Sequence, residues 1–177
     1  GQGRRRASHM RASRLLAARA TLLSVLGADE MRFDCFKKAV NRGVSEQSDV
    51  LALPYDDRKR SRGKGVSENG AAVAWFLERG DVLRGGDVLV STTDHLFSVK
   101  AQPEQVSRVT ATDSFALTRI AYHLGNRHVA LEIREGELLY QPDCVLDQMV
   151  IGLGGRVKEV LSPFQPEGGA YHPHSQH

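Results

Sequence analysis

The sequence has few of the residues on which covalent cross-links, membrane spans and aromatic binding platforms depend. It contains 2 cysteines, 1 tryptophan and 6% aromatic residues in 177 positions. Two cysteines make no disulfide framework, so we expect reduced thiols. The apolar stretch from Leu15 to Leu26 contains Arg19 and is far shorter than the ~20 apolar residues of a membrane span. It also lacks the apolar core and cleavage site of a secretory signal, so we expect a cytoplasmic protein without a membrane span.

The sequence also lacks the common catalytic motifs. It has no Gly-rich phosphate loop, no His-Glu-x-x-His motif and no Gly-x-Ser-x-Gly nucleophile elbow. Asp143 and Asp147 lie one helical turn apart, but their positions suit a helix cap and a solvent-facing charge better than an acid–base pair. We therefore expect a protein that is not an enzyme.

Residues 1–10 look like an expression leader that ends at a start methionine, so they are left out of the fold prediction. They contain three arginines and no acidic residue, which accounts for the whole formal charge of +3. A remainder that is close to neutral gives no electrostatic reason to expect nucleic-acid binding.

Turn residues divide the stretch between residues 31 and 105 into short apolar runs. These runs have strand length and lie at 50–53, 71–77, 88–91 and 96–100. Glu68-Asn69-Gly70 suits a tight hairpin turn. We predict an all-β domain over residues 11–105, without assigning elements in 11–48. The segment 101–104, Ala-Gln-Pro-Glu, interrupts the strand pattern and is the predicted linker to a second domain.

The period of the apolar residues changes after this linker. In order, the predicted elements are a strand at 106–111, a helix capped by Asp113, strands at 128–133 and 138–140, a helix capped by Asp143 and a strand at 156–161. This βαββαβ order predicts a ferredoxin-like domain over residues 106–167, followed by a flexible tail at 168–177. The predicted fold class is α+β.

His128 is the first candidate metal ligand. In the predicted strand it alternates with Val129, Leu131 and Ile133, so its ring is expected on the opposite face. Helices cover one face of a ferredoxin-like sheet, which places His128 on the open face. Taken alone, such a histidine is more often a surface or hydrogen-bonded side chain. A two-fold axis near the open face would bring a second His128 opposite the first and double the number of ligands.

The C-terminal tail holds three more histidines, His172, His174 and His177. Such tail histidines are often tag remnants, but the His-Pro-His spacing lets two rings reach one ion, and a tether raises their effective concentration.

Cys144 stands at the predicted start of a helix, where we expect an exposed side chain and a thiolate-favouring environment. It is either a soft ligand or an inert surface cysteine. Cys35 is predicted to be a core residue.

A dense basic run extends from residue 58 to 64. Its arginines, Arg58, Arg60 and Arg62, are the candidate partner-binding residues, because a run of this kind is either a solvated strand face or a docking site for an acidic partner. The order βαββαβ also occurs in an RNA-recognition module. That module needs aromatic platforms on its central strands, and 138–141 offers only Tyr140, which disfavours RNA.

Four segments of this sequence resemble the urease accessory metallochaperones, which carry nickel to the urease assembly complex. They are Leu-Pro-Tyr-Asp-Asp-Arg-Lys-Arg-Ser-Arg at 53–62, Arg-Gly-Asp-Val-Leu-Arg-Gly-Gly-Asp-Val-Leu at 79–89, Ala-Tyr-His-Leu-Gly-Asn-Arg-His-Val at 121–129 and Pro-Phe-Gln-Pro-Glu-Gly-Gly-Ala-Tyr at 163–171. The Gly-Asn-Arg-His element and the Pro-Phe to Ala-Tyr element carry most of the specificity.

The resemblance implies a homodimer in which two copies of His128 meet around Ni²⁺ at the two-fold axis. It also implies tail ligands at His172 and His174, with His177 as a further candidate, and a nickel-handling GTPase as the protein partner. One departure is Cys144, which stands where some relatives have auxiliary histidines. A ligand there would favour Cu²⁺ or Zn²⁺ over nickel.

Two alternatives stay open at the level of sequence. One is a protein-docking module in which the β domain and the basic run bind a partner and the histidines are incidental. The other is a metal-dependent hydrolase, for which the sequence offers few fixed carboxylates.

Overall fold

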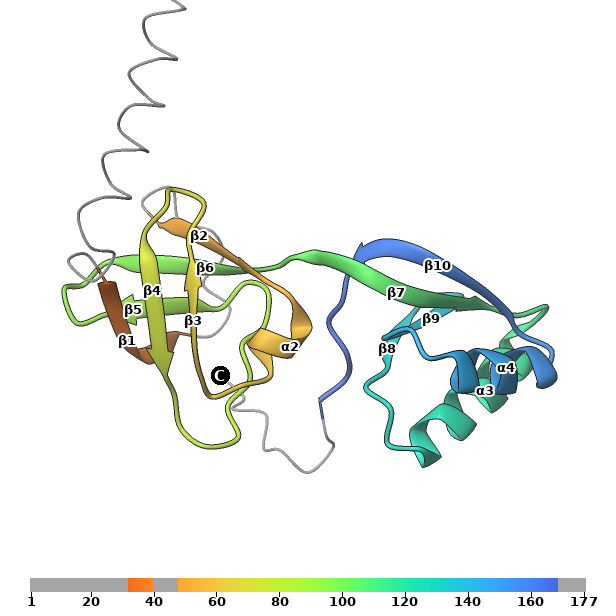
Figure 1. Cartoon of the computed structure of the whole chain (residues 1–177). Helices are drawn as coiled ribbons and strands as arrows, with labels where there is room; N and C mark the ends of the chain where they lie inside the picture. Colours follow the sequence, from red (N-terminus) through yellow and green to blue (C-terminus); the bar gives the residue numbers. More distant parts are fainter. Residues whose placement is uncertain (1–31, 40–47, 169–177) are drawn as a thin grey trace, which may run out of the picture.

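The computed structural model of the protein describes residues 32–39 and 48–168. These residues form two sheets that follow one another along the chain (Figure 1). The first is a six-stranded sheet in the order β2-β6-β5-β1-β4-β3, and the second is a four-stranded sheet in the order β10-β7-β9-β8. The leader and the tail histidines His172, His174 and His177 lie outside the described residues.

The first sheet contains the strands that the turn signals predicted. Its strands are β1 (Arg32–Ala39), β2 (Asp49–Leu53), β3 (Arg62–Val66), β4 (Ala72–Phe76), β5 (Val88–Ser91) and β6 (Leu96–Ala101). One short helix, α2 (Tyr55–Arg58), lies between β2 and β3 and was not predicted. The first domain is therefore rich in β structure but is not all-β within the described residues.

The sequence of β3 fits a strand that packs against a tryptophan. Trp75 on β4 is fully buried, and it pairs with Gly63 across the two strands. A Cβ atom on Gly63 would overlap the indole ring, so the ring fits because the strand has no side chain there. The alternate residues Arg62 and Lys64 are exposed on the outer face. The basic residues of β3 therefore lie on an exposed strand face, as both interpretations of the basic run require.

The second sheet follows the predicted βαββαβ order. Its elements are β7 (Pro103–Thr110), α3 (Ser114–Asn126), β8 (Glu132–Arg134), β9 (Glu137–Tyr140), α4 (Cys144–Gly152) and β10 (Arg156–Pro163). All neighbouring strands are antiparallel. Both helices lie on one face (Figure 1), where Ile120, Leu124 and Val150 pack against the strands. Within the described part of the chain, no helix is long and apolar enough to cross a membrane.

Both predicted helix caps are confirmed. The side chain of Asp113 accepts a hydrogen bond of 2.8 Å from the backbone N–H of Ala116. Asp143 accepts from the N–H groups of Val145 and Leu146 at 2.8 and 3.0 Å. These bonds satisfy donors that a helix leaves free at its N-terminus. The signal is local in sequence, which is why it could be predicted.

The predicted linker at 101–104 is almost entirely strand. β6 ends at Ala101 and β7 begins at Pro103, so Gln102 alone separates the two strands. Proline is tolerated as the first residue of a strand, and Pro103 pairs with Pro163 of β10. An extended segment therefore joins the two sheets (Figure 1).

Candidate metal site at the domain junction

His128 does not lie on a strand, contrary to the prediction. Helix α3 ends at Asn126, and His128 follows in a left-handed conformation with φ of +57°. Its N–H donates to the carbonyl of Gly125 at 2.9 Å, and the N–H of Val129 donates to Leu124 at 3.4 Å. The residues that were predicted to begin a strand therefore end the helix. Histidine is among the few residues other than glycine that occur in this conformation with some frequency.

The expected apolar face of the strand is only partly buried. Leu131 is 7% exposed and packs between the sheet and the helices, whereas Ile133 on the edge strand β8 is 54% exposed. The His128 side chain is itself exposed. Within the described ranges, no hydrogen bond or ion pair holds its ring. The imidazole is therefore accessible from solvent.

The sheet face opposite the helices is not fully open, which is a second correction. Val106 and Leu139 point to that face and pack against Phe164, which follows β10. Tyr55 of helix α2 packs edge-on against the Phe164 ring, with centroids 5.3 Å apart. Part of this face is therefore a contact between the two domains.

The chain after β10 runs beside the segment that leads from His128 into β8. The N–H of Gln165 donates to Glu132 Oε2 at 2.7 Å. The N–H of Glu167 donates to the carbonyl of Leu131 at 2.8 Å. These two bonds fix the last described residues next to the loop that carries His128.

A buried arginine holds the same segment to the first domain. Arg58 is 1% exposed and donates from Nε to the carbonyl of Leu53 at 3.0 Å and from Nη2 to the carbonyl of Phe164. Gly85 adds a hydrogen bond of 2.7 Å from its N–H to Gln165 Oε1. We call Arg58, Phe164, Gly85 and Gln165 the clasp. Arg58 was predicted to bind a partner, and this prediction is wrong because its guanidinium is enclosed between the domains.

The electrostatics of the clasp follow from its burial. Desolvation lowers the pKa of Arg58, and the nearby carboxylates of Glu104 and Glu132 partly oppose this effect. A guanidinium stays charged at neutral pH even when its pKa is lowered. The carbonyl groups around Arg58 therefore solvate a permanent cation.

The other two arginines of the basic run are exposed. The Arg60 side chain is 64% exposed and lies 4.0 Å from Asp57, and Arg62 points outward from β3. Arg62 pairs across the strands with Phe76, whose ring stacks on Phe36 with centroids 5.1 Å apart. An aromatic pair, of which Phe36 is exposed and Phe76 half-buried, therefore lies beside the accessible cations, a feature that the sequence analysis missed.

Cys144 is exposed and Cys35 is buried, as predicted. Burial, together with the nearby Asp34 carboxylate, raises the pKa of the Cys35 thiol to about 11. Cys144 is the first residue of α4. Of the two thiols, Cys144 is therefore the one that a metal ion can reach.

His128 and Cys144 lie at the same end of the second sheet. β8 and β9 are antiparallel, so the beginning of β8 and the end of β9 meet at one end. Helix α3 leads into β8, and α4 follows β9 (Figure 1). This end faces the first domain, because Gln141 Nε2 donates to Asp56 Oδ2 across the junction at 3.3 Å.

This junction is not a complete metal site in a single chain. Within residues 32–39 and 48–168, no three side chains of the His, Cys, Asp or Glu type lie close enough together to hold one ion. The described structure has an exposed histidine and an exposed cysteine at the same end of the second sheet, and the exit of the tail beside the loop that carries the histidine.

Asp147 is not simply a solvent-facing charge, as the sequence had suggested. It accepts a hydrogen bond of 2.5 Å from the hydroxyl of Tyr140. Burial and the Asp147 carboxylate raise the pKa of this tyrosine. Tyr140 is fully buried, so it offers no platform on which a base could stack.

Comparison with known proteins places the chain in a family. The sequence model of the N-terminal domain of the UreE urease accessory protein matches residues 37–102, and the model of its C-terminal domain matches residues 104–177. The chain belongs to the UreE family of urease accessory proteins. Members of this family are accessory proteins and not enzymes, which confirms the predicted non-enzymatic role and removes the hydrolase alternative.

Individual relatives agree with this membership. A urease accessory protein UreE from Teredinibacter turnerae is 47% identical over 139 residues, which cover 78% of this chain and 90% of the relative. A UreE protein from Tolumonas auensis is 52% identical over 123 residues, covering 69% of this chain and 65% of the relative. A UreE protein from Burkholderia lata is 49% identical over 122 residues, covering 69% of this chain and 59% of the relative.

Proposed function

We propose that this chain is a cytoplasmic nickel metallochaperone of urease maturation. Its second domain is ferredoxin-like and forms a homodimer, in which two copies of His128 begin a Ni²⁺ site and tail histidines complete it. The ion then passes by ligand exchange to a nickel-handling GTPase of the urease assembly complex. The observation that carries this proposal is the hydrogen bond from the N–H of Glu167 to the carbonyl of Leu131, which is three residues from His128 in the chain.

Chain lengths allow the tail to reach the histidine. Leu131 is three residues from His128, a span of at most about 10 Å, and His172 is five residues beyond Glu167, at most about 18 Å. His174 and His177 have still longer reach. Because Glu167 and Leu131 are hydrogen-bonded, the tail histidines can close over the His128 of the same chain.

An accessible imidazole suits a site that must release its ion. Imidazole is a good ligand for nickel, and it binds zinc and copper as well. A histidine ring that is not fixed by a second hydrogen bond can dissociate from the metal ion. Another coordinating group can then take its place. Since imidazole binds metal in its neutral form, binding weakens in acid. Cys144, at the same end of the sheet, is an additional ligand for Cu²⁺ or Zn²⁺.

Exposed apolar side chains support the homodimer. On α3, Phe115 is 73% exposed and Tyr122 is 66% exposed. A spacing of seven residues places them on one face of the helix. Covering this face with a second copy would remove apolar area from water. A two-fold axis near Tyr122 would also bring the two His128 loops together, since His128 follows the end of the same helix.

The accessible cations support an acidic protein partner. Arg60 and Arg62 point to solvent, and the stacked Phe36 and Phe76 give an apolar anchor beside them. Interfaces bind through buried aromatic anchors, while charges at the rim steer the encounter. We propose this outer face as the docking face for the GTPase, with no role in nucleic-acid binding.

Nickel calorimetry on the chelator-treated dimer tests the proposal. We expect His128→Ala to weaken nickel binding at least about tenfold, and loss of residues 172–177 to lower affinity less. His95→Ala is the matched control, because His95 belongs to the first domain and should leave binding unchanged. Unchanged stoichiometry and affinity in His128→Ala would refute the proposed site. A chain that binds no nickel at all would favour the alternative of a docking module with incidental histidines.

A further inference from the structure

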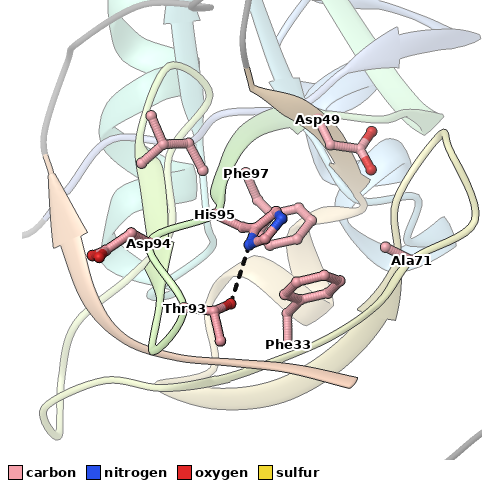
Figure 2. Close-up of a pocket in the computed structure, with 8 residues that line it drawn as sticks. Phe33, Asp49, Ala71, Thr93, Asp94, His95 and Phe97 are labelled. Atoms are coloured by element: carbon pink, nitrogen blue, oxygen red, sulfur yellow. Dashed lines mark hydrogen bonds between the residues drawn. The ribbon is translucent and has the colours of Figure 1, made fainter. Parts of the chain in front are cut away.

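A cavity of about 300 Å³ opens at the edge of the first sheet, in a part of the chain that the proposed nickel site does not use. It is formed by the beginnings of β1 and β2, the turn before β4 and the turn between β5 and β6. Figure 2 shows the side chains that line it. The residues that define its chemistry are Phe33, Asp49, Thr93, Asp94, His95 and Phe97.

Aromatic rings form the centre of this pocket. The ring of Phe33 contacts both His95 and Phe97, with centroids 4.6 and 5.2 Å away. His95 is held in place by a hydrogen bond of 3.1 Å between its Nδ1 and Thr93 Oγ1, drawn as a dashed line in Figure 2. Phe97 is buried, so the ring faces that the pocket offers are those of the half-buried Phe33 and the exposed His95, and ring packing and this hydrogen bond hold them in position.

Two carboxylates stand on opposite sides of these rings (Figure 2). Asp49 Oδ1 accepts from the N–H of Val50 at 2.7 Å, which fixes that carboxylate. Asp94 has a left-handed backbone with φ of +61°, and its N–H donates to the carbonyl of Ser91 at 3.1 Å. Among the described residues, none donates a hydrogen bond to the Asp94 carboxylate. None of the described lining residues is a lysine or an arginine, so the described lining of the pocket carries net negative charge.

We propose that this pocket binds the guanidinium group of an arginine side chain from another polypeptide. A guanidinium is flat and cationic, so it can stack on the rings while its N–H groups reach a carboxylate. A cavity of this size is at the lower limit for a ligand site, which fits one side chain rather than a nucleotide. Anions are repelled by the two aspartates, and a purely apolar group would desolvate the Asp94 carboxylate, to which no described residue donates a hydrogen bond.

Capped amino acids test the ligand class. In amide chemical-shift titrations of the full chain, Nα-acetyl-arginine N-methylamide is expected to shift the signals of Phe33, Asp94 and His95. The citrulline analogue has the same shape without the charge, and it is expected to bind at least about tenfold more weakly. Equal binding of the two compounds, or no shift at these residues up to saturating arginine amide, would overturn the proposal.

Substitutions test the assigned carboxylate. Asp94→Asn is expected to weaken binding of the arginine compound at least fivefold, and the amide spectrum reports whether the fold is kept. Glu78→Gln removes the same charge from an exposed residue outside the pocket and should leave the affinity unchanged. If Asp94→Asn folds and binds arginine as the unsubstituted chain does, the pocket is not a guanidinium site.

A third comparison tests the source of the guanidinium. The tripeptide Gly-Arg-Gly with blocked ends should bind more tightly than ethylguanidine, because a polypeptide also contacts the rim of the pocket. If ethylguanidine binds as tightly as the peptide, the pocket takes a free guanidinium compound and the proposed polypeptide source is wrong.

Discussion

Arg58 and His128 are a cationic and a potentially cationic side chain, and the sequence analysis named both as functional candidates. In the structure one is buried and the other is exposed. Arg58 is 1% exposed and donates to carbonyl groups from both domains. His128 is exposed, and within the described residues nothing holds its ring. Arg58 binds the segment that leads to the tail at Phe164, and the loop that carries His128 binds the same segment through Leu131 and Glu167.

The difference separates a residue that fixes geometry from one that remains accessible to a ligand. A permanent cation solvated by backbone carbonyls cannot leave its place without exposing those acceptors, so it makes a stable clasp. The His128 imidazole has no hydrogen-bond partner among the described residues, so it loses no such bond when a metal ion binds or leaves. In the proposed chaperone, the clasp would set where the tail begins, and His128 would exchange the ion.

Removing the clasp is expected to have the largest effect. Arg58→Met keeps much of the side-chain volume but leaves the buried carbonyls of Leu53 and Phe164 without their donor. We expect a loss of about 3 kcal/mol in the free energy of unfolding, measured in urea. Arg60→Met is the matched control, because the Arg60 side chain is 64% exposed, and it should cost less than about 0.5 kcal/mol.

The same variant tests whether the clasp serves the tail. If Arg58 positions the tail exit, Arg58→Met should weaken the part of nickel binding that residues 172–177 contribute while leaving the part that depends on His128. Deleting the tail from Arg58→Met should then have little further effect on nickel affinity. An unchanged tail contribution in a folded Arg58→Met chain would limit the clasp to a structural role.

A smaller effect is expected from relaxing the backbone at His128. Its φ of +57° costs a side chain with a Cβ roughly 1 kcal/mol relative to glycine. His128→Gly and His128→Ala both remove the imidazole, so both should lose the proposed nickel binding. His128→Gly should be more stable than His128→Ala by about 1 kcal/mol in urea unfolding. Equal stabilities would mean that the left-handed turn is not a feature of the protein in solution.

These two residues also show what the sequence could and could not predict. The caps Asp113 and Asp143 act within three residues of themselves, so the helix starts were correct. The burial of Arg58 depends on the carbonyl of Phe164, which is 106 residues away in the chain, and no local pattern carries that information. The basic run could be recognised, but not which of its arginines turns inward.

His128 was misplaced for a related reason. Its alternation with Val129 and Leu131 has the period of a strand, but the end of helix α3 uses the N–H groups of His128 and Val129 for its last hydrogen bonds. The burial of the opposite sheet face by Tyr55 and Phe164 involves two domains and could not follow from the second domain alone. The predicted order of elements was right because each element depends mainly on its own apolar period.

The two cysteines also contrast a buried group with an exposed one. Substitution of the exposed cysteine is expected to have the smallest effect on stability. Cys144 is exposed and should react with a thiol reagent in the native protein, whereas Cys35 should react only after unfolding. Cys144→Ser should change the free energy of unfolding by less than about 0.5 kcal/mol and abolish the native reaction. One reactive thiol per native chain and two per denatured chain is the expected count.

The pKa of Cys35 extends this contrast to a dependence on pH. Burial and Asp34 raise its pKa from 9.0 to about 11, so the folded chain holds the thiol proton more tightly than the unfolded chain does. The corresponding stability is fully present below pH 9 and is lost as the pH rises from about 9 to 11, because only the unfolded chain releases the proton in that range. Cys35→Ala should remove this dependence, whereas Cys144→Ser should retain it. If Cys144→Ser abolished the dependence instead, the exposed thiol rather than the buried one would be its source.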